Sequence, residues 1–474
     1  LAELTPEWAW SKAIRDTKML TAEKREPFLV QGSNEPKADF KKRAELSAYA
    51  AIVPQIAERI EGAVWKKPPI ILAPEAMSGF TSKVTPTGLD LVEFTKEVCL
   101  DALWGRFGVA LVDRPRMAGG VAPANAAEAE ALGMDKPYAV LYTAEQVLDY
   151  RLDRLGRLEY IRLDGPMYNR GSLLIREIRE VTLAGIRVSR IVKDSGGLES
   201  LEQDEPIPLA PELQAAGMLP VAVCNYKRID AVRGRSPLSG ALQAELNSFR
   251  LLSDIMFDLW LSGHPTLLPK VRATLDEIGV GASKYLKLTP TGAANEEPES
   301  ITYLEAALPG LAKQMERYAS ARAEIVEQAG VRPQAQTTGP EAASGVSIAW
   351  QFETSEANVL SNVADMAADF AWELLGIAAL DMGVLTADKL ATDISVSYSK
   401  DFSLQSAERM VATAQAFRGL LGAQSTATKE ILRRAVTATL DNLSPEMEAA
   451  IRAEIDASGA YEAPAPAFGF GGSE

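Results

Sequence analysis

The chain has 474 residues, and its content of 47% hydrophobic and 24% charged residues is ordinary for a folded globular protein, which excludes disorder of the whole chain. Asp and Glu outnumber Lys and Arg by 64 to 49, for a net charge of −15. This sign excludes a protein that grips DNA through a large basic surface, although DNA could still pass it without sticking. At about 150 residues per domain, the length indicates two to four structural units.

Signals for membrane insertion and secretion are weak. The sequence has no run of about 18 apolar residues, so we expect no membrane span. Residues 1–12 mix acidic and aromatic side chains and lack the three regions of a signal peptide. Cys99 and Cys224 lie in apolar patterns and are expected to be buried thiols in a reducing compartment.

Catalytic motifs are also missing. The only histidine, His264, excludes a two-histidine zinc site, and Cys/His or Ser/His catalysis would have to run through it. It lies in a helix-ending turn, where a solvated or helix-capping imidazole is expected. The sequence contains no phosphate-binding Gly-x-x-x-x-Gly-Lys-Ser/Thr loop, no Gly-x-Gly-x-x-Gly turn, no Gly-x-Ser-x-Gly elbow and no EF-hand loop. We therefore expect neither an enzyme nor a cofactor or metal site.

In the first half of the chain, apolar residues at three- and four-residue spacing predict a helix over 44–65 and another over 88–104. Pro54 lies inside the first, so either that helix kinks or two helices meet there. A β-rich region comes next, with strands predicted over 106–113, 138–142, 146–152, 158–163, 173–183, 186–192 and 219–227. Helices combined with an antiparallel sheet predict the α+β fold class.

Two long helices with a short β-rich insert between them are predicted in the middle of the chain. The first covers 237–262, roughly 39 Å at 1.5 Å per residue, and the second covers 311–329. The insert of about 45 residues contains strand-like segments at 266–271, 284–288 and 301–304. On geometry alone this is a helical hairpin with an elaborated loop.

Beyond Gly330 the periodicity disappears over 331–345, which predicts a polar surface loop. A long helix is then predicted over 347–381 and a strand over 394–398. The last part of the chain is predicted to be helical, over 404–421, 426–440 and 445–457, and the Gly/Ala/Pro-rich tail 461–474 to be disordered.

Several short motifs resemble, in their order, a portal-like family of tailed double-stranded DNA bacteriophages. They are Gly62-Ala-Val-Trp-Lys-Lys-Pro-Pro69, Trp104-Gly-Arg-Phe-Gly-Val-Ala-Leu-Val-Asp-Arg-Pro115, Leu251-Leu-Ser-Asp254, Gly263-His-Pro-Thr-Leu267 and Val396-Ser-Tyr-Ser-Lys-Asp-Phe402. The likeness spans residues 45 to 440, with Pro54 as a departure from the pattern. It implies a portal protein: a ring, usually of twelve subunits, that forms the conduit for DNA packaging and ejection at one capsid vertex.

The resemblance also implies a portal fold and a division of the chain. An α/β wing would comprise 1–236 and, with a long helix and a strand, 346–402. The remaining parts would be two stem helices at 237–262 and 310–330, a small β-rich clip at 263–309, a tunnel loop at 331–345, a helical crown at 403–460 and the tail at 461–474.

Three groups of functional residues are implied by the resemblance. The tunnel loop would contact passing DNA through four residues: Arg332, Gln334, Gln336 and Thr337. The clip would bind the packaging motor and later the connector. Its contact residues would be Lys270, Arg272, Lys284 and Tyr285. The stem would pack, partly across the subunit boundary, through Leu242, Phe249, Met256, Leu259, Met315 and Tyr318.

The implied partners are further copies of the chain, the terminase large subunit, the head–tail adaptor, the major capsid and scaffold proteins, and double-stranded DNA that passes without specific binding. No membrane is implied. Assembly would take place in the cytoplasm of the bacterial host, and the finished ring would belong to the virion.

Two alternatives stay open. The first is a non-enzymatic cytoplasmic scaffold or assembly protein without a DNA channel. The second, less favoured, is an enzyme whose catalytic carboxylate no motif reveals. The native mass separates them from a portal, because only a portal accounts for a closed twelve-membered ring of about 613 kDa (12 × 51.1 kDa).

Overall fold

The computed structural model describes most of the first 400 residues and a few isolated positions after them. The described ranges are 5–16, 21–114, 136–170, 173–193, 199–262, 266–270, 300–304, 309–331 and 343–400, with 402, 429, 450–451 and 453–455. The chain divides into two compact units, Leu1–Lys400 and Asp401–Glu474. The helices predicted after 403 and the tail lie almost wholly outside the described residues. All labelled helices and strands belong to the first unit.

Four helices and a short 3-10 turn open the described chain: α1 (Thr5–Arg15), α2 (Ala22–Arg25), η3 (Glu26–Phe28), α3 (Lys37–Leu46) and α4 (Val53–Val64). Of the two alternatives for 44–65, a kinked helix is wrong and two helices are confirmed: α3 ends at Leu46 and α4 begins at Val53. Pro54 lies in the first turn of α4, where the missing N–H removes no helical hydrogen bond.

A three-stranded antiparallel sheet forms the centre of this unit, in the order β3-β2-β9. Its strands are β2 (Gly108–Asp113), β3 (Tyr138–Thr143) and β9 (Val221–Cys224). All six residues of β2 are buried, as expected for a strand with neighbours on both sides. The helices that pack against this sheet are α6 (Leu91–Gly105) and α11 (Ala343–Asp381). Asp90 caps α6, since its side chain accepts a hydrogen bond from the backbone of Glu93.

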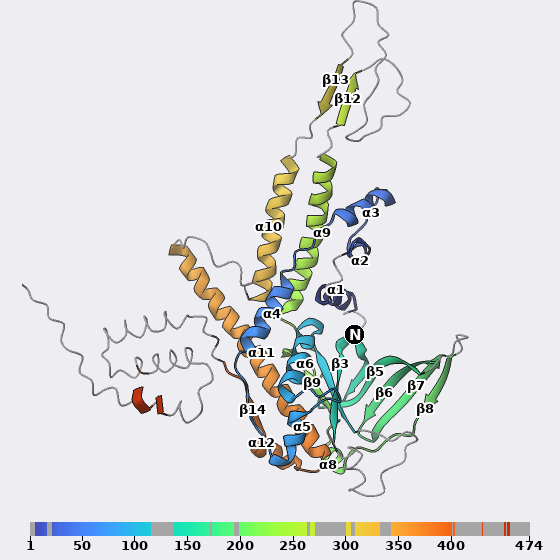
Figure 1. The fold of residues 1–474 in the computed structure, drawn as a ribbon, viewed down its shortest axis with the longest axis vertical. Helices are drawn as coiled ribbons and strands as arrows, with labels where there is room; N and C mark the ends of the chain where they lie inside the picture. Colours follow the sequence, from blue (N-terminus) through green and yellow to red (C-terminus); the bar gives the residue numbers. More distant parts are fainter. Residues whose placement is uncertain are drawn as a thin grey trace, which may run out of the picture. The chain divides into compact units, whose positions relative to one another are not determined.

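A second antiparallel sheet has five strands, in the order β4-β5-β6-β7-β8. They are β4 (Val147–Leu152), β5 (Leu158–Arg170), β6 (Leu173–Thr182), β7 (Gly185–Lys193) and β8 (Glu199–Gln203). Figure 1 shows β5 to β8 side by side, with β8 outermost. The predicted strands of this region are thus present. β8 was not predicted, because every residue of this strand is exposed and no apolar alternation marks it.

Smaller elements complete the described unit. Two-stranded antiparallel ladders join β1 (Ile70–Leu72) to β14 (Ser395–Ser397) and β10 (Lys227–Arg228) to β11 (Gly234–Arg235). The short helices are η4 (Glu75–Met77), α5 (Ser78–Ser82), η5 (Ala144–Gln146), α8 (Pro211–Ala216), η6 (Ala387–Lys389) and α12 (Leu390–Asp393). The described residues therefore combine helices with antiparallel sheets, which confirms the α+β class. Of the helices described, none is both long and apolar enough to cross a membrane.

The middle of the chain forms the predicted helix pair. Its helices are α9 (Leu238–Ser262) and α10 (Pro309–Ala329), and the strands that lie between them in sequence are β12 (Thr266–Lys270) and β13 (Ser300–Leu304). The predicted strand at 284–288 lies outside the described residues. The predicted long helix is also present, as α11.

Candidate functional site

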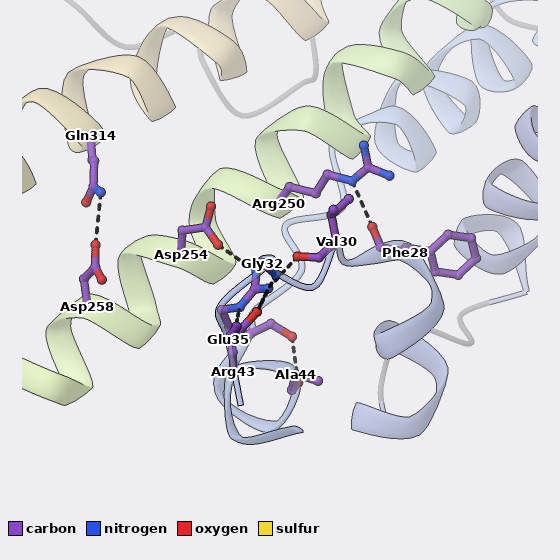
Figure 2. Close-up of polar contacts among 11 residues, drawn as sticks. Phe28, Val30, Gly32, Glu35, Arg43, Ala44, Arg250, Asp254, Asp258 and Gln314 are labelled. Atoms are coloured by element: carbon purple, nitrogen blue, oxygen red, sulfur yellow. Dashed lines mark hydrogen bonds and ion pairs between the residues drawn. The ribbon is translucent and has the colours of Figure 1, made fainter. Parts of the chain in front are cut away.

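The α9–α10 pair is antiparallel along its length (Figure 1). Near the end of α9 and the start of α10, Gln314 Nε2 donates to Asp258 Oδ2 at 3.0 Å, a contact drawn in Figure 2. At the opposite end of the pair, Gly240 faces Gln328: a Cβ on this glycine would lie 2.7 Å from Gln328 Oε1. Gly240 of α9 and Gln328 of α10 are therefore neighbours across the pair.

The connection between the two helices carries a β-ladder. β12 and β13 pair antiparallel from Thr266 opposite Leu304 to Lys270 opposite Ser300. β12 begins four residues after α9 ends, and β13 ends five residues before α10 begins. Of the residues expected in the clip, Lys270 is the last residue of β12, whereas Arg272, Lys284 and Tyr285 lie outside the described residues.

The residues expected to pack the stem differ in their burial. Leu242 and Phe249, in the first half of α9, are buried within the chain. Met256, further along, is half-buried, and Leu259, near the end of α9, is 39% exposed. On α10, Tyr318 is half-buried and Met315 is 56% exposed. The exposed apolar side chains of the pair therefore lie toward the end at which β12 and β13 are attached.

Aromatic residues from the N-terminal segment cover the buried part of α9. The Trp10 ring lies 5.7 Å from that of Phe249, and the Tyr49 ring lies 6.4 Å from it, centroid to centroid. Trp10 Nε1 also donates to the carbonyl oxygen of Leu242 at 3.0 Å. No local sequence pattern predicts these contacts, because each joins segments that lie far apart along the chain.

A buried carboxylate joins α9 to α4. Glu245 is 1% exposed, and its Oε1 accepts hydrogen bonds from the backbone N–H groups of Ile52 at 2.8 Å and Val53 at 3.1 Å. Burial raises the pKa of Glu245 to about 7, while these hydrogen bonds oppose the rise. Glu245 thereby satisfies N–H groups at the start of α4 that have no partner within the helix. A carboxylate inside an apolar stripe, three residues after Leu242, was the signal available in the sequence.

An arginine clamps the N-terminal segment to the outer part of α9 (Figure 2). Arg43, on α3, donates to both carboxylate oxygens of Glu35 at 2.9 and 2.8 Å, to Asp254 Oδ1 at 2.7 Å and to the Val30 carbonyl at 2.7 Å. Hydrogen bonding from Arg43 lowers the pKa of Glu35, whereas partial burial raises the pKa of Asp254. The clamp fixes the segment 30–46 against the helix.

The same face of α9 carries a second attachment. The Arg250 side chain donates from Nε to the Phe28 carbonyl oxygen at 2.9 Å, as Figure 2 shows. Together with Arg43, it holds the chain between α2 and α3 along one side of the helix. That side is therefore occupied within one chain.

The far end of α10 leads toward α11. Gly330 ends α10 with φ of +67°, a conformation that favours glycine, and a Cβ there would lie 2.9 Å from Ser355 Oγ of α11. Arg59 of α4 donates to Glu356 Oε1 of α11 at 2.6 Å. The expected tunnel-loop residues Arg332, Gln334, Gln336 and Thr337 lie between these two helices in sequence but outside the described residues.

Two further buried groups lie at the central sheet. Cys99 of α6 and Cys224 of β9 are buried thiols, as predicted, with their sulfur atoms 3.5 Å apart. Glu373 of α11 accepts a hydrogen bond from the backbone of Val223 at 3.3 Å, and burial raises the pKa of Glu373 to about 7. Within the described ranges, no group of three or more His, Cys, Asp or Glu is placed to hold a metal ion.

No family model matches this chain, and no curated protein matches it. The site described above consists of the helix pair and its anchors. They contain buried carboxylates that cap or pair with other groups, and exposed apolar side chains on two projecting helices. Such an arrangement serves packing against another protein surface better than it serves the binding of a small molecule.

Proposed function

We propose that this chain is a portal protein, which forms a ring at one capsid vertex and acts as the conduit for DNA packaging and ejection. The observation that carries the proposal is the antiparallel α9–α10 pair with a β-ladder in its connection and apolar side chains exposed on it. A helix with apolar side chains exposed in one chain gains stability when neighbouring copies cover them. A ring of copies covers these residues on every subunit.

The order of elements along the chain also supports the proposal. Helices and sheets precede α9 and would form the wing, α9 and α10 would form the stem, and β12 and β13 would form part of the clip. The long helix α11 would return to the wing. Residues 332–342 of the proposed tunnel loop and nearly all of the proposed crown lie outside the described residues, so these two assignments rest on the sequence resemblance; residues 343–345, expected in the loop, belong to α11.

The net charge of the chain fits a conduit for DNA better than a protein that binds DNA tightly. The net charge of −15 per chain means that few phosphates would be neutralised, so sequence-independent affinity for duplex DNA stays low. In this proposal DNA passes through the ring without being held, and the terminase large subunit, and later the head–tail adaptor, dock at the clip. The protein acts without covalent catalysis and resides in the virion.

Electron microscopy of the purified chain tests this proposal. We expect closed rings of uniform subunit number with an axial channel wide enough for duplex DNA. Addition of the purified terminase large subunit is expected to produce density at the clip end of the ring. Particles without a channel, at concentrations at which all protein is assembled, would favour the scaffold alternative.

A further inference from the structure

The short hairpin β10–β11 is a concentrated basic surface on an acidic chain. Its cations are Lys227, Arg228, Arg233 and Arg235, against a single carboxylate, Asp230. Asp230 is already engaged by Arg233 at 2.7 Å and by the Tyr150 hydroxyl at 3.0 Å. The other three cations are exposed. The charge of Arg228 favours the ionised forms of Asp369 and Glu373 on α11, whereas Lys227 and Arg235 form no ion pair with a carboxylate in the described part of the chain. Ile229, between them, is 53% exposed.

The register of this hairpin places like charges together. Lys227 lies directly opposite Arg235 across the two strands, and like charges in that position destabilise a β-ladder. The Tyr226 ring, 5.4 Å from the Lys227 ammonium, offers a weak cation–π contact. An external group of carboxylates would relieve the repulsion between the two cations, so the hairpin is suited to an acidic partner.

An acidic surface of matching composition lies at β8 and the residues after it. Glu199, Glu202, Asp204 and Glu205 fall within seven residues, and the whole segment 199–208 is exposed. Glu199 pairs with Lys193 and Asp204 pairs with Arg190. Glu202 and Glu205 have no ion pair among the described residues.

Apolar groups accompany both charged surfaces. Leu201, on β8, is 61% exposed and Ile207 is 40% exposed, as Ile229 is on the basic hairpin. Each surface therefore offers unpaired charges beside an exposed aliphatic side chain. An apolar centre with a charged rim is the usual composition of a protein–protein interface.

The two surfaces lie at opposite edges of one sheet. The hydrogen bond from Tyr150 of β4 to Asp230 ties the basic hairpin to the β4 edge, and β8 is the other edge of the order β4-β5-β6-β7-β8. Four inter-strand spacings of about 4.8 Å separate these edges by roughly 19 Å. The acidic edge therefore lies too far away to neutralise the basic hairpin of its own chain.

We infer that the basic hairpin, through Lys227, Ile229 and Arg235, binds the acidic edge (Leu201, Glu202, Glu205 and Ile207) of a second copy of this chain. Two different surfaces meet in this contact, so it is heterologous and leads from copy to copy in one direction, closing into a ring when the rotation permits. The inference rests on the proposed function for the closure into a ring. It adds a wing-to-wing contact to the stem packing.

Charge reversal at each surface tests the contact. One variant carries Lys227→Glu with Arg235→Glu, and the second carries Glu202→Lys with Glu205→Lys. We expect each variant alone to need at least tenfold more protein than the wild type for assembly at about 150 mM salt, where charges further apart than about 8 Å are screened. A control with Lys83→Glu and Lys389→Glu makes the same change of charge as the hairpin variant, outside both surfaces, and is expected to assemble normally.

Mixing gives the decisive outcome. Each reversed variant carries the same sign on both surfaces, so a 1:1 mixture can assemble only in alternating order. We expect the mixture to recover assembly, with even subunit numbers and equal amounts of the two chains in native mass spectra. Recovery also demonstrates that both variants are folded.

The remaining outcomes overturn distinct claims. If the wild type forms rings and both reversed variants assemble like it, the contact is refuted and the portal proposal stands. If reversal at the hairpin leaves assembly unchanged and removes binding of a short DNA duplex, the hairpin is a nucleic-acid surface and the contact is again refuted. A wild type that stays monomeric refutes both the contact and the portal proposal.

Discussion

Glu245 Oε1, on α9, lies 3.1 Å from the backbone nitrogen of Val53, the first residue of α4. The same carboxylate interacts with Tyr49, and burial together with this carboxylate raises the pKa of Tyr49. Burial raises the pKa of Glu245 from its usual 4.5 to about 7. Because burial penalises the charged form, the folded chain is most stable when this carboxyl is protonated, even though the two backbone hydrogen bonds favour the carboxylate.

This relationship predicts a pH dependence of stability. Below about pH 4.5 the carboxyl is protonated in both the folded and the unfolded chain, and its contribution is fully present. As pH rises through about 7, the unfolded chain is already ionised and the contribution is lost. A difference of about 2.5 pKa units corresponds to roughly 3 kcal/mol.

We predict that the unfolding free energy of the wild type falls between pH 5 and pH 8 by roughly 2–3 kcal/mol more than that of Glu245→Gln. The reason is that the glutamine cannot ionise. Urea unfolding at both pH values measures this. Glu373→Gln is a matched comparison, because burial raises the pKa of Glu373 to about 7 as well, and its effect should add to that of Glu245→Gln. If the unfolding free energies of wild type and Glu245→Gln change in parallel with pH, the raised pKa of Glu245 is contradicted.

The Arg43 clamp is predicted to hold the N-terminal segment on α9. Arg43→Ala leaves Glu35 and Asp254 without their shared partner and should lower the unfolding free energy by about 2–4 kcal/mol, less than for a fully buried pair because the Asp254 side chain is 52% exposed. Hydrogen exchange should rise mainly over 30–46. Arg43→Lys, which cannot bridge both carboxylates in the same way, should rescue only part of the loss. Unchanged exchange over 30–46 in Arg43→Ala would show that the clamp carries no stability.

Stem packing between subunits is tested at Met315, because this side chain is 56% exposed in one chain. Met315→Asp should change the unfolding free energy of the monomer by no more than about 0.5 kcal/mol, as for other surface substitutions, and should shift the protein from rings to monomers in size-exclusion chromatography. Met315→Leu is the control and should assemble normally. Phe249→Ala should instead destabilise the monomer itself by about 3–5 kcal/mol, since Phe249 is buried within the chain. If Met315→Asp still forms uniform rings, this face of α10 does not lie in the subunit interface.

Weak DNA binding is expected of a conduit with this charge. A twelve-membered ring would carry a formal charge of −180 (12 × −15), so few counterions are released when a duplex enters. Fluorescence anisotropy with a short labelled duplex at about 150 mM salt should give no saturation below the micromolar range. Submicromolar binding by the isolated ring would contradict a channel that lets DNA slide.

The elements that could be predicted from the sequence are those with a strong local period. α9, α10 and α11 are found from apolar spacing, and the strands β2 to β7 from runs of β-branched and apolar residues. Pro54 indicated a kink or two helices, but the break between Leu46 and Val53 could not be placed, because the N–H groups that start α4 are satisfied by Glu245, 193 residues away from Ile52. Trp10 is likewise held by contacts with α9, so no local sequence pattern could predict its buried position. Opposite charges at the two edges of one sheet became visible only when the strand order was known.

The native mass of the assembled protein tests the central claim most directly. If the chain is a portal subunit, native mass spectrometry at near-physiological salt should show one closed species at an integral multiple of 51.1 kDa, about 613 kDa for twelve copies (12 × 51.1 kDa). Its mass should not grow when the protein concentration is raised, since a closed ring has no free end. A monomer of 51.1 kDa at every concentration, or a ladder of open oligomers that lengthens with concentration, would contradict the portal account.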